Sequence, residues 1–176
     1  MDNGDGILEF GIKRENEERR DGGVGIVFDP VTQRYAVSIE PSNGKLRLFA
    51  GGVEPDEDLE KGVLREVTEE SGLYDFHYVE KITEVMAHYH NSLRKVNRVT
   101  KSACFLVILK STNLVEVKHE EHETFDLHWA TVEELFSNWK LNNTNNDYDH
   151  YFYFFKKAVP RANELGYDTT SDINLL

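Results

Sequence analysis

Apolar residues along the chain fall into short runs, and most of these runs have the composition of β-strands. They are rich in β-branched and aromatic residues and are separated by turn signals that contain Pro, Gly, Asn or Asp. We expect strands at residues 22–29, 34–40, 46–50, 76–90, 98–110 and 126–130.

Three further segments have helical spacing. Residues 58–71 carry one apolar stripe, begin with carboxylates and are followed by Gly72, a residue typical of C-terminal caps. A second helix is expected from Thr131, because Glu134 completes a capping box with it, and an aromatic third helix covers residues 150–165. Strands and helices without regular alternation indicate an α/β fold with a mixed β-sheet, and argue against a doubly wound parallel sheet.

The chain length of 176 residues is enough for one domain with a sizeable core. We expect this domain at residues 21–165. A polar flanking segment, residues 1–20, precedes it and includes a short edge strand at residues 7–12. A loose C-terminal tail, residues 166–176, follows it.

The formal net charge of −12 limits the partners that the surface can attract. Such a surface repels nucleic-acid backbones and anionic membranes, so neither is expected as a partner. A polyanionic ligand would need a local basic patch or a bridging cation. The most apolar run, residues 104–109, is too short to span a membrane. The single cysteine, Cys104, excludes a disulfide framework, and the N-terminus lacks the apolar core of a signal peptide, so we expect a cytoplasmic protein.

Three glutamates of the first helix are spaced so that they share one face: Glu66, Glu69 and Glu70. Like charges at these spacings destabilise a helix by about 0.2–0.5 kcal/mol per pair. One interpretation is a solvated acidic face, and the other is a site for a divalent cation. Carboxylate oxygens favour Mg²⁺, Mn²⁺ or Ca²⁺ over zinc, and a bound cation would turn the acidic face into a phosphate-binding site.

The residues around these glutamates have the spacing G-x5-E-x7-R-E-U-x-E-E-x-G-U, in which U is aliphatic. The pattern is filled without a gap by Gly51, Glu57, Arg65, Glu66, Val67, Glu69, Glu70, Gly72 and Leu73. In this motif the chain resembles the Nudix hydrolase family. The motif covers about an eighth of the chain, and the order of strands and helices over residues 20–160 is compatible with the α/β/α sandwich of that family.

The resemblance implies a metal site and assigns residues to it. Glu66, Glu69 and Glu70 would bind Mg²⁺ or Mn²⁺, and the backbone carbonyl of Ala50 would complete the shell. Either Glu66 or Glu70 would also act on the attacking water. Neither that choice nor the number of metal ions follows from the sequence.

Two supporting residues and one more glutamate are implied in the same way. Arg65 and Glu57 would form a pair that secures the loop against the helix. A glutamate from the loop before the last strand would join the catalytic set, and Glu123 is preferred to Glu120 and Glu121. An exposed loop acid is the alternative interpretation of Glu123.

The implied reaction is attack of water on a phosphorus of a nucleoside diphosphate that is joined to another moiety. Metal ions neutralise phosphate oxygens and lower the pKa of a bound water, and a carboxylate takes its proton. Arg47, Phe49 and Tyr89 are candidates for substrate contact, although core packing also explains the two aromatic residues. Tyr89 resembles the dinucleoside-polyphosphate subgroup, whereas "LFAGGVEP" resembles the nucleotide-sugar subgroup, so the substrate stays open.

Two other functions exist among proteins with this motif. A non-catalytic Nudix-like nucleotide sensor would typically lack some of the motif glutamates, and all of them are present here. Isopentenyl diphosphate isomerase needs a catalytic cysteine, and Cys104 falls in a predicted buried strand. The resemblance also leaves a homodimer open, with residues 1–20 as a candidate contact.

Overall fold

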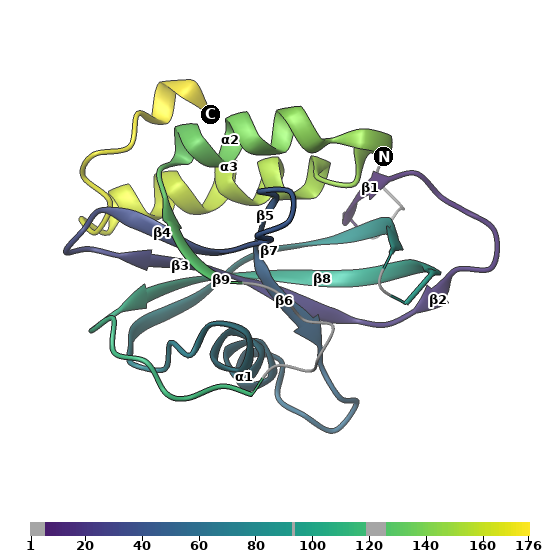
Figure 1. Cartoon of the computed structure of the whole chain (residues 1–176), viewed down its shortest axis with the longest axis horizontal. Helices are drawn as coiled ribbons and strands as arrows, with labels where there is room; N and C mark the ends of the chain where they lie inside the picture. Colours follow the sequence, from purple (N-terminus) through teal and green to yellow (C-terminus); the bar gives the residue numbers. More distant parts are fainter. Residues whose placement is uncertain (1–5, 93, 119–125) are drawn as a thin grey trace.

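The chain folds into three layers. The computed structural model describes residues 6–92, 94–118 and 126–176. Figure 1 shows a central sheet with α1 (Leu59–Ser71) on one face and α2 (Val132–Asn142) and α3 (Asp149–Glu164) on the other. The predicted α/β/α sandwich with a mixed sheet is confirmed. Within the described ranges, no helix combines the length and the apolar character needed to cross a membrane.

The central sheet has nine strands within the described residues. They are β1 (Leu8–Gly11), β2 (Glu18–Arg19), β3 (Gly22–Asp29), β4 (Arg34–Ile39), β5 (Leu46–Arg47), β6 (Phe49–Gly52), β7 (Phe76–Asn91), β8 (Val96–Leu109) and β9 (Asp126–Ala130). The order is β1-β7-β8-β3-β4-β5, while β2 pairs with β8, β6 with β3 and β9 with β4. The sheet is mixed because β7 and β8 form an antiparallel hairpin, whereas β3 runs parallel to β8.

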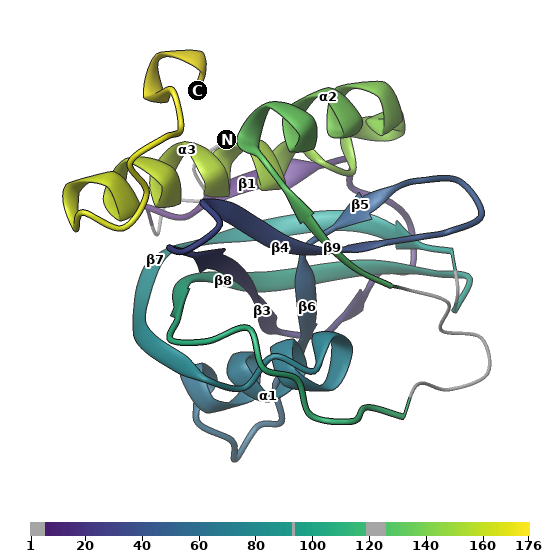
Figure 2. The same ribbon diagram turned by 60° about the vertical axis from the view of Figure 1, so that its left-hand side comes forward.

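The sheet forks along β3. Residues 22–25 pair with β6, whereas residues 27–29 pair with β4. The strand predicted at residues 46–50 is therefore two strands, because the chain changes its partner from β4 to β3 between β5 and β6. The fork brings the end of β6 to α1, as Figure 2 shows.

Two glycines of β3 let α1 pack close to the sheet. A Cβ atom on Gly23 would lie 2.6 Å from Cγ2 of Val63, and one on Gly25 would lie 2.5 Å from Cγ2 of Val67. Both valines are almost fully buried. The helix ends at Gly72, whose φ of 84° is the left-handed conformation that glycine adopts readily. The glycines of β3 thus set the distance between α1 and the sheet, and Gly72 sets where the helix ends.

The other face of the sheet is covered by an aromatic core. Trp139 of α2 and Phe154 and Phe155 of α3 are fully buried, and the ring centroids of Trp139 and Phe155 lie 5.1 Å apart. The indole Nε1 of Trp139 donates a hydrogen bond of 3.0 Å to the carbonyl of Leu46. Burying a large apolar side chain stabilises a fold by about 1.5–3 kcal/mol. This layer is the rigid support of the sheet. A short 3₁₀ helix, Thr144–Asn146, lies between α2 and α3 in sequence, and a second one, Ile173–Leu175, follows α3.

The N-terminal segment is built into the sheet. β1 pairs in parallel with β7 and β2 with β8, and the chain between them passes around the tip of the β7–β8 hairpin (Figure 1). We call residues 6–21 the N-terminal strap. His88 of β7 holds it: Nδ1 lies 2.9 Å from the carboxylate of Glu17, and Nε2 contacts the carboxylate of Glu9. The strap is therefore more than a flanking segment.

The C-terminal residues pack against the domain, in contrast to the loose tail that we expected. Asp168 is fully buried and accepts a hydrogen bond of 2.7 Å from the hydroxyl of Tyr35. The side chain of Gln33 donates to the carbonyl of Tyr167 at 2.9 Å. These hydrogen bonds join positions that are far apart in sequence, so no local sequence pattern predicts them.

Candidate functional site

The acidic face of α1 meets β6 at a pair of glycines. The side chain of Glu66 lies over Gly51, so close that a Cβ atom there would be 2.1 Å from its Cδ. Glu70 reaches the preceding residue, where one of its oxygens accepts a hydrogen bond of 3.0 Å from the amide of Ala50. Only a residue without a side chain fits under Glu66 in this arrangement.

Arg65 links the motif carboxylates. Its Nε and Nη2 bind the two oxygens of Glu57 at 2.8 and 3.0 Å, an arrangement that fixes both side chains. Its Nη1 donates to Glu66 at 2.8 Å and to Glu69 at 3.1 Å. Nη2 also donates to the carbonyl of Gly52 at 3.3 Å. Arg65 thereby connects the loop after β6 to the acidic face of α1.

The pKa values of the motif residues shift in different directions. Hydrogen bonds from Arg65 lower the pKa of Glu57, and the same bonds, with those to Glu66 and Glu69, raise the pKa of the Arg65 guanidinium. Burial raises the pKa of Glu66, the charge of Glu69 adds to the rise, and Arg65 opposes it. The side chain of Glu66 is 17% exposed. Its negative charge is therefore poorly solvated, a condition that a bound cation would relieve.

The donors on α1 fit a hard divalent cation in type. Three carboxylates and the carbonyl of Ala50 are oxygen ligands of the kind that Mg²⁺ and Mn²⁺ select. Two of the carboxylates, Glu66 and Glu69, share the same nitrogen of Arg65. In the described ranges, no three His, Cys, Asp or Glu side chains are grouped closely enough to hold a metal ion as they stand. Glu123 lies outside the described residues.

Two of the three substrate candidates are brought together near Glu70. Burial raises the pKa of Tyr151 on α3, and Arg47, Glu70 and Tyr89 all lie close enough to modify that pKa. Arg47 also forms an ion pair of 3.5 Å with Glu40. Arg47, Tyr89 and Glu70 therefore all lie within electrostatic range of Tyr151 at the start of α3.

The third candidate, Phe49, is placed differently. Its ring is 1% exposed and belongs to the core beneath α1, with Val63 and Val67. Stacking a base on this ring would require opening the core. The structure thus favours the packing interpretation for Phe49.

Three residues near the site were not singled out from the sequence. Tyr148 and Tyr151 stand three positions apart at the start of α3, a helical spacing that puts both on one face. Burial raises the pKa of Tyr148, and the adjacent Arg47 opposes this rise. Arg20, from the N-terminal strap, lies against Gly52. No sequence signal pointed to Arg20, because its position depends on the path of the strap.

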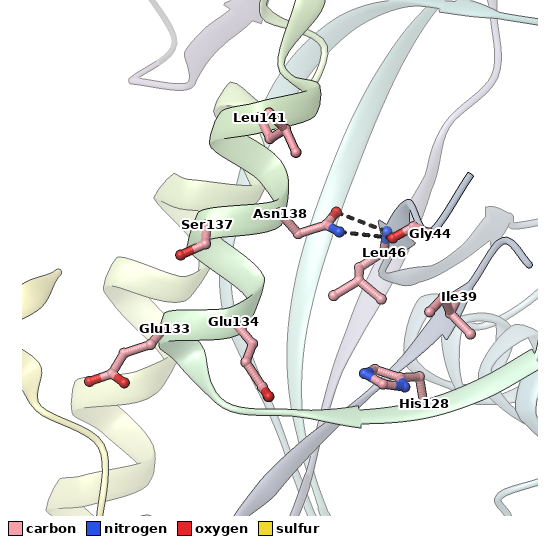
Figure 3. Close-up of a pocket in the computed structure, with 9 residues that line it drawn as sticks. All are labelled: Ile39, Gly44, Leu46, His128, Glu133, Glu134, Ser137, Asn138 and Leu141. Carbon is pink, nitrogen blue, oxygen red and sulfur yellow. Dashed lines mark hydrogen bonds between the residues drawn. The ribbon is translucent and has the colours of Figure 1, made fainter.

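A separate recess of about 540 Å³ lies between β4, β5, β9 and α2 (Figure 3). Leu46, His128 and Leu141 line it, and the side chain of Asn138 crosses to β5. That side chain accepts from the amide of Leu46 at 3.0 Å and donates to the carbonyl of Gly44 at 2.8 Å. None of the predicted site residues that the structure describes lines this recess. We therefore do not assign the reaction to it.

Comparison with known proteins places the chain in a family. A family model described as NUDIX domain matches residues 23–154, three quarters of the chain. The chain belongs to the NUDIX family. The match lies inside the domain expected at residues 21–165 and contains the whole motif, so the resemblance found in the sequence is confirmed. None of the curated proteins compared with the chain is a significant match.

Solved structures are similar to this chain. The MutT protein from Methanosarcina mazei Go1 is 17% identical, with a TM-score of 0.51, over 84% of this chain and 98% of that one. A NUDIX hydrolase from Nitrosomonas europaea is 15% identical, with a TM-score of 0.49, over 90% of this chain and 96% of that one. The NUDIX domain of Shewanella oneidensis NrtR, solved with ADP ribose, is 16% identical, with a TM-score of 0.46, over 70% and 79%. The likeness to the Methanosarcina mazei protein, at 17% identity, concerns the fold alone.

Proposed function

We propose that this Nudix protein is a pyrophosphohydrolase that cleaves a nucleoside diphosphate joined to another moiety, with Mg²⁺ or Mn²⁺ as cofactor. One observation carries the proposal: α1 brings Glu66 over Gly51 and Glu70 to the amide of Ala50, while Glu69 shares Arg65 with Glu66, and no glutamate of the motif is missing. A small nucleotide derivative in the cytoplasm is the expected substrate.

The metal would be held by Glu66, Glu69, Glu70 and the carbonyl of Ala50. When bound, it would neutralise phosphate oxygens and lower the pKa of an attacking water. It would also take over from Arg65 the role of cationic partner to Glu66 and Glu69. The buried setting of Glu66 supports this assignment, because its carboxylate lacks solvation that a cation would replace.

The side chains of the chain itself have distinct roles in this proposal. Arg65 and Glu57 keep the loop in place, because their paired hydrogen bonds join it to α1. Glu66 or Glu70 accepts the proton of the attacking water, and Glu123 is a further candidate for that step. Arg47 and Tyr89, which both lie within electrostatic range of Tyr151, would contact the part of the substrate that is not cleaved.

A non-catalytic nucleotide sensor is the second candidate. The observation that favours it is the engagement of Glu66 and Glu69 by Arg65, which leaves the described carboxylates without a metal-ready grouping. A sensor would bind a nucleotide and release no product. The isomerase alternative is disfavoured, because Cys104 is fully buried in β8 and burial raises the pKa of its thiol.

A substrate panel separates these functions. Purified protein is incubated with Mg²⁺ or Mn²⁺ and with nucleoside triphosphates, dinucleoside polyphosphates, ADP-ribose or nucleotide sugars, and the products are separated by chromatography. We expect hydrolysis of at least one class, and its loss when the metal is chelated. Binding of a nucleotide without turnover of any class would support the sensor instead.

A further inference from the structure

The N-terminal strap delivers one arginine to the edge of the candidate active site. The backbone amide of Arg20 donates a hydrogen bond of 3.1 Å to the carbonyl of Val99 on β8. Just before it, Glu18 and Arg19 are in parallel register with Arg98 and Val99. The position of Arg20 is therefore fixed by sheet pairing and does not depend on a free loop.

The guanidinium of Arg20 lies on the second glycine of the motif region. A Cβ atom on Gly52 would be 2.1 Å from its Nε and 2.9 Å from its Cζ. The carbonyl of Gly52 also accepts a hydrogen bond from Arg65. Arg20 is near enough to Glu66 for its charge to oppose the rise in the pKa of that carboxyl group. Arg20 and Glu66 thus lie against two adjacent glycines, Gly52 and Gly51.

The acidic residues next to Arg20 are engaged with other partners. Asp21 binds Arg19 at 3.1 Å and accepts from the amide of Lys101 at 3.0 Å. Glu18 lies 3.6 Å from Arg98. Within the described ranges, the guanidinium of Arg20 itself forms no side-chain hydrogen bond or ion pair. It is exposed and available to an incoming anion.

A second cation and an aromatic ring adjoin Arg20. Arg98 and Tyr89 are cross-strand neighbours on β8 and β7. Both Arg98 and Arg20 are close enough to Tyr89 to oppose the rise that burial causes in its pKa. Arg20 and Arg98 therefore both lie near Tyr89, and Arg20 also lies near Glu66, although the protein as a whole carries a net charge of −12.

We propose that Arg20 binds a phosphate group of the substrate, next to the phosphorus that is attacked, and that Arg98 supplies a second positive charge there. A guanidinium suits this task because it stays charged and donates paired hydrogen bonds to phosphate oxygens. The assignment rests on the proposed hydrolase function. It makes the N-terminal strap a part of the active site and favours substrates whose phosphates extend beyond the metal site.

The test uses three variants of the full-length protein. Arg20→Ala removes the guanidinium, Arg20→Lys keeps the charge, and Arg19→Ala is the matched control because Arg19 pairs with Asp21 on the surface. We expect Arg20→Ala to lower kcat/KM by about 10- to 100-fold, the range for a hydrogen bond to a charged group, mainly through KM. Arg20→Lys should recover part of the loss, and Arg19→Ala should stay within about twofold.

Binding of inorganic pyrophosphate in the presence of Mg²⁺, followed by titration calorimetry, is the readout that does not need turnover. Arg20→Ala should weaken this binding by about tenfold or more, and Arg19→Ala should not. Unchanged kcat/KM and unchanged pyrophosphate binding in Arg20→Ala would overturn the assignment of Arg20 while leaving the hydrolase intact. An equal loss in Arg19→Ala would also overturn it, because it would indicate a general effect of surface charge.

The two proposals can fail separately. If the wild-type protein hydrolyses no member of the substrate panel, the proposed function fails. If pyrophosphate binding still depends on Arg20 in that case, the phosphate-binding assignment stands.

Discussion

At the scale of single residues, the site depends on the absence of a side chain at Gly51 as well as on the charged side chains around it. Gly51 leaves room for Glu66, which carries a poorly solvated carboxylate against the end of β6. Arg65 neutralises Glu66 and Glu69 and holds Glu57 at the same time. The strong negative charge of α1 is therefore compensated locally, in a form that a metal ion could replace.

The tight contact at Gly51 gives a first prediction. Gly51→Ala would place a Cβ atom 2.1 Å from Cδ of Glu66, so the glutamate must move. We expect Mn²⁺ affinity and hydrolysis to fall by about tenfold or more, because ligand positions within about 0.5 Å are needed for a productive site. Calorimetric Mn²⁺ titration and initial rates measure both effects. Wild-type Mn²⁺ affinity in Gly51→Ala would show that Glu66 is not a ligand in this position.

At the scale of elements, the site joins α1, β6 and the N-terminal strap. The helix and the strand are neighbours in sequence, but the strap comes from the start of the chain. His88 holds the strap to β7 through Glu9 and Glu17, and the side chain of Glu17 is only 8% exposed. The strap that carries Arg20 is thus held by His88 on β7 in addition to its pairing with β8.

Removing the histidine should destabilise the fold. His88→Leu removes the imidazole that joins the half-buried Glu9 and the buried Glu17 to β7, and the loss of these buried hydrogen bonds costs about 1–3 kcal/mol. His90→Leu is the matched control on the same strand, because the exposed His90 bonds only to Asn97 among the described residues. Its effect should be below about 0.5 kcal/mol. Urea denaturation measures the free energy of unfolding of both variants. Equal losses would show that the contacts of His88 with Glu9 and Glu17 add no stability beyond that of an exposed histidine.

The sequence predicted local elements well and long-range pairings poorly. The strand at residues 22–29 and the helix at residues 58–71 agree with β3 and α1 within a residue, because their apolar patterns and caps are local. The motif predicted the acidic face for the same reason. The places of Arg20, of the strap and of Tyr151 follow from pairings between distant segments, which no local pattern encodes.

At the scale of the whole molecule, the N-terminal strap and the C-terminal residues both pack against the sandwich. The strap completes one edge of the sheet, and the C-terminal residues bind the turn after β3 and the start of β4. Burial raises the pKa of Tyr35 well above its usual value, and the negative charge of Asp168 adds to the rise. The C-terminal contact is therefore stable only while the Tyr35 hydroxyl keeps its proton.

This pair gives a prediction for alkaline pH. A tyrosine whose pKa is raised by folding contributes stability in full below the usual tyrosine pKa of about 10, and loses it as the pH rises from there toward the raised value. Tyr35→Phe should lower stability by about 1–3 kcal/mol at neutral pH, since Asp168 loses a donor. The gap to the wild type should narrow above about pH 10. Urea denaturation from pH 7 to 11 measures the gap, and a constant gap would contradict the argument.

The central claim is that the glutamates of α1 make this protein a metal-dependent hydrolase. The most direct test compares wild type, Glu70→Gln and Glu60→Gln in one Mg²⁺-dependent assay on the substrate panel. Glu60 is an exposed acid in the first turn of the same helix, so its variant carries the same change in charge. We predict that Glu70→Gln loses at least about 100-fold in kcat/KM while Glu60→Gln keeps the wild-type rate. Equal hydrolysis by Glu70→Gln and the wild type would contradict the proposed site.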